Sequence, residues 1–265
     1  MAWGDNYYAQ TGDGLGTCQP KSTPTLVCGV SSAIAVAGTH VILSNGTMMG
    51  WGWNMSGEAG NNTNTAYAGW DSPVAVCCIS TAVAIGQGAI AALANGTVMV
   101  WGGNGSGELG VNTTNSCQTP LVMCCVSNAI AVNRNDDNSI VLLANGCVMV
   151  SGYGPPGMLG NNTVANVSKP VFVCCISTAV ALATTGDSAS VLLANGTLMS
   201  WGDGNSGRLG NNSVVTRSKP VAVCTITGAY GSVAVSKQRQ LSGRNFVLSR
   251  GGAQYVTHVL FLHKG

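Results

Sequence analysis

The segment Leu193-Ala194-Asn195-Gly196-Thr197, followed by Trp201-Gly202, recurs along this chain at intervals of 50 residues. The same motif begins again at Leu43, Leu93 and Leu143, with small changes in each copy. Self-similarity at a fixed period of about 20 to 50 residues is typical of solenoids and propellers. The 265 residues are therefore read as an array of repeats.

Two further motifs occur at fixed positions relative to the first. The first of them, Gly-x-x-Gly, follows each Trp-Gly position at Gly57 and Gly60, Gly107 and Gly110, Gly157 and Gly160, and Gly207 and Gly210. The other sets a proline four residues before a cysteine, at Pro24 and Cys28, Pro73 and Cys77, Pro120 and Cys124, Pro170 and Cys174, and Pro220 and Cys224. We expect a single domain, residues 1–265, with repeats near 1–50, 51–100, 101–150, 151–200 and 201–265.

Each repeat is typical of short strands joined by glycine turns. Segments such as Val74-Ala75-Val76-Cys77-Cys78-Ile79 are β-prone and bounded by proline and serine. The Asn-Gly pair between two apolar segments predicts a hairpin with a type I′ turn, in which both central residues have positive φ. No segment has the caps and periodicity of an amphipathic helix. An all-β unit of about 50 residues fits a propeller blade, which buries its faces only against neighbours.

These motifs resemble the RCC1-type repeat, most closely in Trp101-Gly102-Gly103-Asn104, Gly107-Glu108-Leu109-Gly110 and Pro120. The resemblance extends over residues 3 to 229 and implies an all-β chain, a β-propeller of about five blades. Three features depart from the family. The chain has five Trp-Gly or equivalent starts where seven blades are common, the family's structural histidine occurs only as His40, and Ser151 replaces a tryptophan.

The two ends of the chain predict how the ring closes. Residues 257–265 resemble residues 39–46, so the tail returns to the repeat and residues 232–252 become an insertion in the fifth unit. Met1-Ala2-Trp3-Gly4 is the strand that follows this hairpin in the other repeats. We expect the N- and C-terminal strands to pair in one blade, which removes sheet edges. Pairing between molecules, which builds a filament, is the alternative.

Low charge dominates the composition. Only 8% of the residues are charged and the formal net charge is +2, whereas about 25% charged residues is usual for a soluble domain. Such a chain attracts polyanions weakly, so nucleic acid and anionic membranes are disfavoured as partners. No segment reaches the roughly 18 uninterrupted apolar residues of a membrane span.

Cysteine is unusually abundant, with 11 residues. Neighbouring residues on a strand face opposite ways, so the doublets are poor zinc sites. Two interpretations stay open: cysteine as a small buried apolar residue between blades, or a ladder of disulfides that requires an oxidising compartment. The disulfide candidates are Cys28, Cys77, Cys78, Cys124, Cys125, Cys174, Cys175 and Cys224.

Asn-x-Ser/Thr sequons are also frequent. Three of them, Asn45, Asn95 and Asn195, coincide with the Asn-Gly turns and are explained by turn chemistry. The others are Asn54, Asn61, Asn104, Asn112, Asn161, Asn166 and Asn211. Those that follow Gly-x-x-Gly would place N-linked glycans along one rim of the ring. We predict that several sequons are occupied, and with low charge and many cysteines this favours an extracellular or surface-exposed protein.

Residues suited to chemistry are sparse. The histidines and acids form no paired acid and base, and no cofactor or metal motif is present, so we expect no catalytic residue, no metal and no cofactor. One basic group, Lys237, Arg239, Arg244 and Arg250, lies in the predicted insertion. It is either a solvated loop or a contact for a partner or an anionic glycan.

Three functions compete. The favoured one is a non-enzymatic structural or adhesive glycoprotein, a rigid platform that binds another surface or self-associates as a filament or homo-oligomer. The alternative is an intracellular interaction module of the exchange-factor or inhibitor type, which binds a protein partner through one propeller face; the family resemblance implies a small GTPase and chromatin. The third is an enzyme or lectin that uses the central channel, with Trp53, Trp70 and Tyr67 as stacking candidates.

Overall fold

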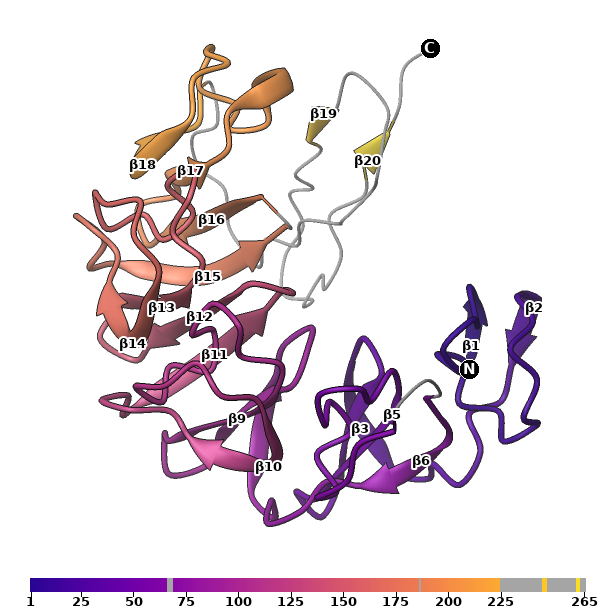
Figure 1. Ribbon diagram of the computed structural model, residues 1–265. Helices are drawn as coiled ribbons and strands as arrows, with labels where there is room; N and C mark the ends of the chain where they lie inside the picture. Colours follow the sequence, from indigo (N-terminus) through magenta and orange to yellow (C-terminus); the bar gives the residue numbers. More distant parts are fainter. Residues whose placement is uncertain (66–68, 186, 225–244, 247–260, 263–265) are drawn as a thin grey trace.

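The computed structural model describes residues 1–65, 69–185, 187–224, 245–246 and 261–262, and this part of the chain is built from strands and turns. Four antiparallel sheets of four consecutive strands follow one another around an arc (Figure 1). Among the described residues, no helix is long and apolar enough to span a membrane.

Each four-stranded sheet is one blade, numbered here in chain order. Blade 1 contains β3 (Ala33–Ala37), β4 (His40–Leu43), β5 (Met48–Gly52) and β6 (Trp70–Ala75). Blade 2 contains β7 (Ala82–Ile85), β8 (Ile90–Leu93), β9 (Val98–Gly102) and β10 (Cys117–Val122). Blade 3 contains β11 (Ala129–Arg134), β12 (Asn138–Leu143), β13 (Val148–Gly152) and β14 (Val167–Phe172). Blade 4 contains β15 (Ala179–Thr184), β16 (Ser188–Leu193), β17 (Leu198–Gly202) and β18 (Arg217–Ala222), with a 3₁₀ turn, η1 (Asn205–Gly207), before its last strand.

Two short sheets lie at the ends of the chain. β1 (Ala2–Gly4) pairs with β2 (Lys21–Thr25), as the third and fourth strands do in every blade, so this sheet is the outer half of a fifth blade. β19 (Asn245–Phe246) pairs with β20 (Phe261–Leu262). The predicted closure between β1 and the C-terminal strand depends on residues 247–260 and 263–265, outside the described residues, and stays a prediction.

Blades and sequence repeats are out of phase. Blade 2 begins at Ala82 and ends at Val122, whereas the Trp-Gly motifs that mark the repeats stand at Trp51 and Trp101, in the third strands. Each repeat therefore gives its outer two strands to one blade and its inner two strands to the next. As a consequence, no blade can form from a single repeat.

The Asn-Gly hairpins differ from the predicted type I′ turn. Gly46 has φ of 79°, but Asn45 is not among the residues with positive φ. The Gly46 N–H donates to the carbonyl of Leu43 at 2.8 Å, and the Leu43 N–H donates to that of Thr47 at 2.9 Å. This pattern is a type I turn followed by one left-handed glycine. The Asn45 Oδ1 accepts hydrogen bonds from the N–H and the hydroxyl of Thr47. These bonds explain why threonine follows Asn-Gly in the motif.

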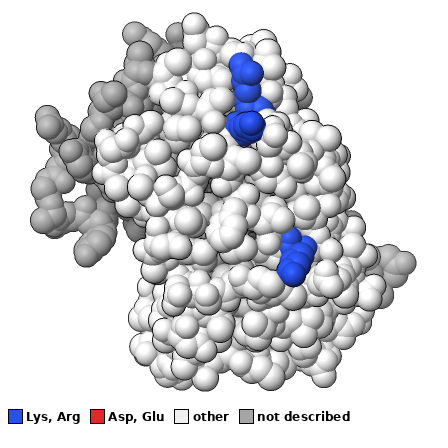
Figure 2. Space-filling view, turned by 90° about the vertical axis from the view of Figure 1, so that its left-hand side faces the viewer, with Lys and Arg blue, Asp and Glu red and all other residues white. Residues whose placement is uncertain are grey.

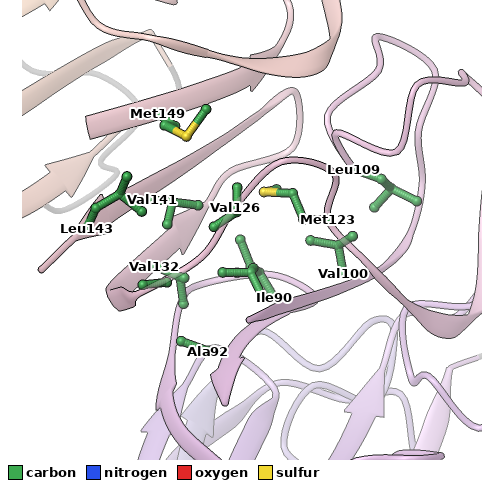
Figure 3. Packing of buried hydrophobic residues seen from close by; sticks show 12 residues of the cluster. Ile90, Ala92, Val100, Leu109, Met123, Val126, Val132, Val141, Leu143 and Met149 are labelled. Atoms are coloured by element: carbon green, nitrogen blue, oxygen red, sulfur yellow. The ribbon is translucent and has the colours of Figure 1, made fainter. Parts of the chain in front are cut away.

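The hydrophobic core is divided into layers between blades. Figure 3 shows one such layer, in which Ile90 and Val100 of blade 2 lie near Met123, Val126 and Val141 of the chain that enters and forms blade 3. A second layer joins blades 3 and 4, and a third joins blades 1 and 2. Because each layer needs both neighbours, the stability of a blade depends on the ring.

A tryptophan at the joints ties each blade to the loop before it. The Nε1 of Trp101 donates to the carbonyl of Glu58 at 2.8 Å, and the Nε1 of Trp201 donates to that of Met158 at 2.9 Å. Both rings are fully buried. A Cβ at Gly160 would lie 2.7 Å from the Trp201 Nε1, so the second glycine of Gly-x-x-Gly is required by the indole of the next blade.

Ser151 replaces the tryptophan at the joint of blades 2 and 3 without losing its hydrogen bond. The Ser151 Oγ donates to the carbonyl of Glu108 at 3.1 Å, the position that an indole uses at the other joints. A Cβ at Gly110 would lie 2.9 Å from both Ser151 Oγ and Pro170 Cγ. The close packing on the glycine is therefore kept, with a proline ring beside the smaller side chain.

The first glycine of Gly-x-x-Gly contacts the outermost strand of the next blade. Gly107 has φ of 84°, and a Cβ there would lie 2.6 Å from the Cα of Ser168 in β14. Gly105, two residues earlier in the same loop, has open space around its Cβ position. The two positions form a matched pair.

We predict that Gly107→Ala lowers the free energy of unfolding by about 2 kcal/mol or more, since it adds left-handed strain to a clash with backbone. Gly105→Ala should change it by less than about 1 kcal/mol, in either direction. Urea denaturation followed by circular dichroism measures both. Equal effects of the two substitutions would contradict the close approach of blades 2 and 3.

Candidate functional site

Strand order gives the propeller two faces. The loop face holds the turns between the first and second strands and the Gly-x-x-Gly loops; the turn face holds the Asn-Gly turns and the cysteine segments that lead to the next blade. Like ends of neighbouring blades adjoin. On the turn face, Ala82 N–H donates to the carbonyl of Gly46 at 3.0 Å, and on the loop face, Asn62 N–H donates to that of Gln118 at 3.1 Å.

The two faces differ completely in charge. All nine acids lie on the loop face, in loops or at the strand ends beside them: Asp5, Asp13, Glu58, Asp71, Glu108, Asp136, Asp137, Asp187 and Asp203. The connecting segments of the turn face contain no Asp, Glu, Lys, Arg or His: they are residues 26–32, 43–47, 75–81, 93–97, 122–128, 143–147, 172–178 and 193–197. Charge therefore marks one face of the molecule as different from the other.

Aromatic residues gather on the loop face. The ring of Tyr8 stands edge-on to that of Trp53, with centroids 4.2 Å apart, and Tyr7 stands edge-on to Tyr8 at 4.7 Å. We call Tyr7, Tyr8 and Trp53 the aromatic cluster; Tyr7 is 66% exposed and Trp53 36%. Tyr153 occupies the position of Trp53 in blade 3 and is also exposed.

Of the two predicted stacking residues that the structure describes, Trp53 and Trp70, Trp53 has a ring contact of this kind. Trp70 is half-buried at the start of β6, and Tyr67 lies outside the described residues. The structure thus pairs Trp53 with tyrosines of the first loop, which the sequence did not single out.

A buried charge pair underlies the loop face between blades 2 and 3. The guanidinium of Arg134 donates to the carbonyls of Trp101 and Gly103 and lies 3.8 Å from the Glu108 carboxylate. Burial lowers the pKa of Arg134, and the charge of Glu108 opposes this shift. The sequence analysis did not predict this pair. The feature that could have indicated it is the charged Arg134 at the end of an innermost strand, where the equivalent strand of blade 4 ends in the neutral Thr184.

Two of the predicted glycosylation sites are buried hydrogen-bonding residues, so the prediction is wrong for them. Asn54 and Asn104 have no exposed surface. The Asn104 amide nitrogen donates to the carbonyls of Thr113 and Asn115, and its oxygen accepts from Leu109 N–H. A glycan is attached through that same nitrogen. These residues close the Gly-x-x-Gly loops instead.

The sequons after Gly-x-x-Gly also have a structural explanation that the sequence analysis did not see. The Oδ1 of Asn61 accepts the hydroxyl of Thr63 at 2.6 Å, and that of Asn161 accepts the hydroxyl of Thr163 at 2.9 Å. Asn112 has φ of 63°, in the left-handed region that asparagine tolerates. Turn chemistry thus accounts for the sequons at Asn61, Asn112 and Asn161. Occupancy of the remaining sites stays a prediction: Asn45, Asn61, Asn95, Asn112, Asn161, Asn166, Asn195 and Asn211.

The cysteine doublets are not part of the strands, contrary to prediction. The fourth strand of blade 1 ends at Ala75, and Cys77 and Cys78 lie in the turn that follows. Cys78 has φ of 59°, and Gly29 holds the equivalent left-handed position in the first repeat, with φ of 66°. Cys125 and Cys175 have the same conformation and, like Cys78, are exposed.

The structure favours the apolar interpretation for the first cysteine of each doublet. Cys28, Cys77, Cys124 and Cys174 are half-buried free thiols, and Cys224 is exposed. Equivalent positions in stacked sheets are separated by about 10 Å, whereas a disulfide needs Cα atoms within about 7 Å. A ladder between equivalent positions therefore does not fit the stacking of the blades.

The predicted basic contact residues cannot be compared with the fold. Lys237, Arg239, Arg244 and Arg250 all lie outside the described residues.

Comparison with known proteins agrees with this architecture. A family model described as "Regulator of chromosome condensation (RCC1) repeat" matches residues 195–236. The crystal structure of human WBSCR16 is similar to this chain at 18% identity, with a TM-score of 0.69 over 89% of this chain and 66% of that one. Residues 195–236 are an RCC1 repeat, and the chain shares the fold of this structure.

Prp20p of Saccharomyces cerevisiae is a second similar structure, at 16% identity and a TM-score of 0.63 over 78% of this chain and 54% of that one. Prp20p is described as binding Gsp1p and histones. Another structure, of Kap60 bound to yeast RCC1 (Prp20), matches at 15% identity and a TM-score of 0.58, over 74% of this chain and 50% of that one. None of the curated proteins matches the chain. This chain spans about half to two thirds of the length of these structures, and the likeness confirms an all-β propeller fold.

His40, which the sequence analysis matched to the histidine of the RCC1-type repeat, lies in the joint between blades 1 and 2. Its Nε2 donates to the carbonyl of Glu58 at 2.9 Å, the same oxygen that accepts from Trp101. The imidazole is 2% exposed and stands edge-on to the indole. Burial lowers the pKa of His40 from 6.5 to about 4, the hydrogen bond to Glu58 opposes this shift, and the charge of Arg134 adds to it.

We predict that this joint is acid-sensitive. The unfolded chain binds a proton on His40 near pH 6.5, whereas the folded chain does so only near pH 4. The contribution of the neutral, buried imidazole to the free energy of unfolding is therefore present in full above pH 6.5. It is lost as the pH falls towards 4, by an amount on the order of 3 kcal/mol. Urea titrations across this range measure it.

His40→Ser is the matched variant, because Ser190 stands at the equivalent position of blade 4. The variant should be less stable at pH 7, and its stability should fall less steeply between pH 6.5 and 4. Parallel pH profiles of the two proteins would show that His40 is not the titrating group.

Proposed function

We propose that this chain is a non-enzymatic interaction module that binds a protein partner through its loop face. The observation that carries the proposal is the aromatic cluster, Tyr7, Tyr8 and Trp53, in which Tyr7 and Trp53 are exposed, on the face that also holds every acidic residue. Tyrosine and tryptophan surrounded by polar groups are typical of the residues that dominate binding energy at protein interfaces.

The loops that present these aromatics are held rigidly. Asn54 Oδ1 accepts from Ala59 N–H at 2.9 Å, and its amide nitrogen donates to the carbonyl of Thr63 at 3.1 Å. Asn6 makes the same kind of bonds in the first loop, to Thr11 and Thr17. A preorganised loop loses little conformational entropy on binding, which favours affinity.

The places of the titratable groups with a perturbed pKa support a role without catalysis. His40 and Arg134 are enclosed between blades, where they bond to carbonyls of the chain itself, and Asp13 forms an ion pair with Lys21 at 2.9 Å. A binding function uses the surface that these groups stabilise.

The comparisons support the class of partner rather than its identity. The similar Prp20 structures are described with the protein partners Gsp1p, histones and Kap60. Their identity to this chain is below 20%, so the partner of this chain is left to experiment.

The interaction module is preferred to the structural glycoprotein because turn chemistry accounts for most sequons.

Polymerisation through the rim is also disfavoured. The outermost strands carry a proline in every blade, at Pro73, Pro120, Pro170 and Pro220, and proline on an edge strand blocks pairing with another chain. Figure 2 shows a face of the molecule with basic residues at two places and no acidic residue.

The experiment is affinity capture with immobilised chain, identification of the enriched proteins by mass spectrometry, and measurement of the affinity of the best candidate. Tyr7→Ala with Trp53→Ala should weaken binding by at least about 10-fold, since each removes an exposed anchor. Phe172→Ala on the turn face is the control and should leave the affinity within about two-fold. Equal losses would contradict a loop-face site, and a nucleotide-free small GTPase among the captured proteins would identify the exchange-factor class.

A further inference from the structure

The innermost strands of all four complete blades share one irregularity. The register shifts between Ala33 and Ala35 in β3, and between the equivalent alanines of β7, β11 and β15. Each shift is a β-bulge, which re-aims the side chain of the extra residue. The residues at these bulges are all apolar and β-branched: Ile34, Val83, Ile130 and Val180.

The bulges turn these side chains towards solvent. Val83, Ile130 and Val180 are 58%, 51% and 53% exposed. They stand at the end of the inner strands nearest the turn face, one residue after the alanines whose N–H groups bond to the neighbouring Asn-Gly turns. Single exposed apolar residues need no explanation, but the same exposure in every blade forms a repeated surface.

Larger apolar residues extend this surface outward. Val122 and Phe172, at the turn-face ends of β10 and β14, are 57% and 58% exposed. Phe172 also lines a half-open cavity of about 520 Å³ with Cys125, Leu143 and Met149. The turn face thus carries exposed apolar groups from the inner strands to the rim.

We propose that two copies of this chain associate through their turn faces. The connecting segments of this face hold no charged side chain, so a charged group of a partner would be desolvated there without compensation, at high cost. This disfavours nucleic acid and charged protein surfaces. A second turn face has the matching neutral chemistry, and a two-fold axis brings the same patch of both copies together.

Two features distinguish a second copy from a membrane surface. Membrane-binding faces carry lysine or arginine and a belt of tryptophan or tyrosine, none of which occurs in the turn-face connections. The face instead presents exposed asparagines at its turns, Asn45, Asn95 and Asn195, whose Oδ1 atoms are used locally. Their amide nitrogens supply neutral hydrogen-bond donors across an interface between proteins.

The first test is molar mass by light scattering after size exclusion, across a concentration series up to about 100 µM. The wild-type chain, of 26.8 kDa, should show twice its mass at the upper end. Ile130→Asp should raise the dissociation constant at least about 100-fold, because it buries a charge in the interface. Val214→Asp is the matched control: Val214 is 65% exposed but lies on the loop face, and this variant should dimerise as the wild type does.

Cross-linking gives an independent readout. Cys78, Cys125 and Cys175 are exposed on the turn face, and Cys18 and Cys224 are the other exposed cysteines among the described residues. In a background in which Cys18 and Cys224 are serine, a short bis-maleimide should join two copies, and a variant in which Cys78, Cys125 and Cys175 are also serine should not be joined. Monomers at all concentrations, or equal effects of Ile130→Asp and Val214→Asp, would overturn the proposal, as would binding of monomers to phosphatidylcholine vesicles. Because the loop-face variants of the proposed partner site are different residues, failure of one proposal leaves the other standing.

Discussion

The hydrogen bond from a tryptophan indole to a carbonyl of the preceding blade is the interaction on which the rest of this propeller depends. At the joint of blades 1 and 2, the Glu58 carbonyl accepts from both Trp101 and His40. To place that oxygen, the loop must turn tightly around the indole, which requires glycine at Gly60 and a buried asparagine, Asn54, to hold its backbone. The replacement of tryptophan by Ser151 keeps the hydrogen bond while the ring is lost. The donor at this point of the joint is thus retained in a repeat that has lost the aromatic ring.

The same constraint separates the roles of the two faces. Loop-face residues that hold the joint, such as Glu108 and Arg134, are largely enclosed by neighbouring blades. Positions of the loops that do not face a joint are free to vary, and there the aromatic cluster has arisen. The turn face has no comparable variation, because its Asn-Gly turns and cysteine segments are copied from blade to blade. Variable chemistry on one face and uniform, neutral chemistry on the other are what a module with a specific partner and a self-complementary surface requires.

The repeat period, the strands and the Trp-Gly motif could be predicted from the sequence because they are properties of composition and spacing. The errors arose where a single backbone angle decides the outcome. Asn45 and Cys78 each stand in a turn, but only the structure shows that the first has negative φ and the second positive φ. The bulges at Val83 and Ile130 were equally invisible, since alternating alanine and β-branched residues read as a regular strand. Asn54 and Asn104 match a glycosylation motif, and their burial follows from the fold of a loop that no local pattern reveals. Arg134 is isolated in sequence and acquires its partners only when blades 2 and 3 stack.

The offset between repeats and blades has a consequence for how such a chain can change its length. Because every repeat spans a joint, a cut at any point followed by removal of one full period rejoins two halves that belong to the same kind of blade. A deletion or duplication that joins equivalent positions of two repeats therefore leaves no broken sheet and no orphaned indole. What changes is the number of blades in the propeller. Unequal recombination within this array would thus alter the curvature of the ring before it damaged any blade.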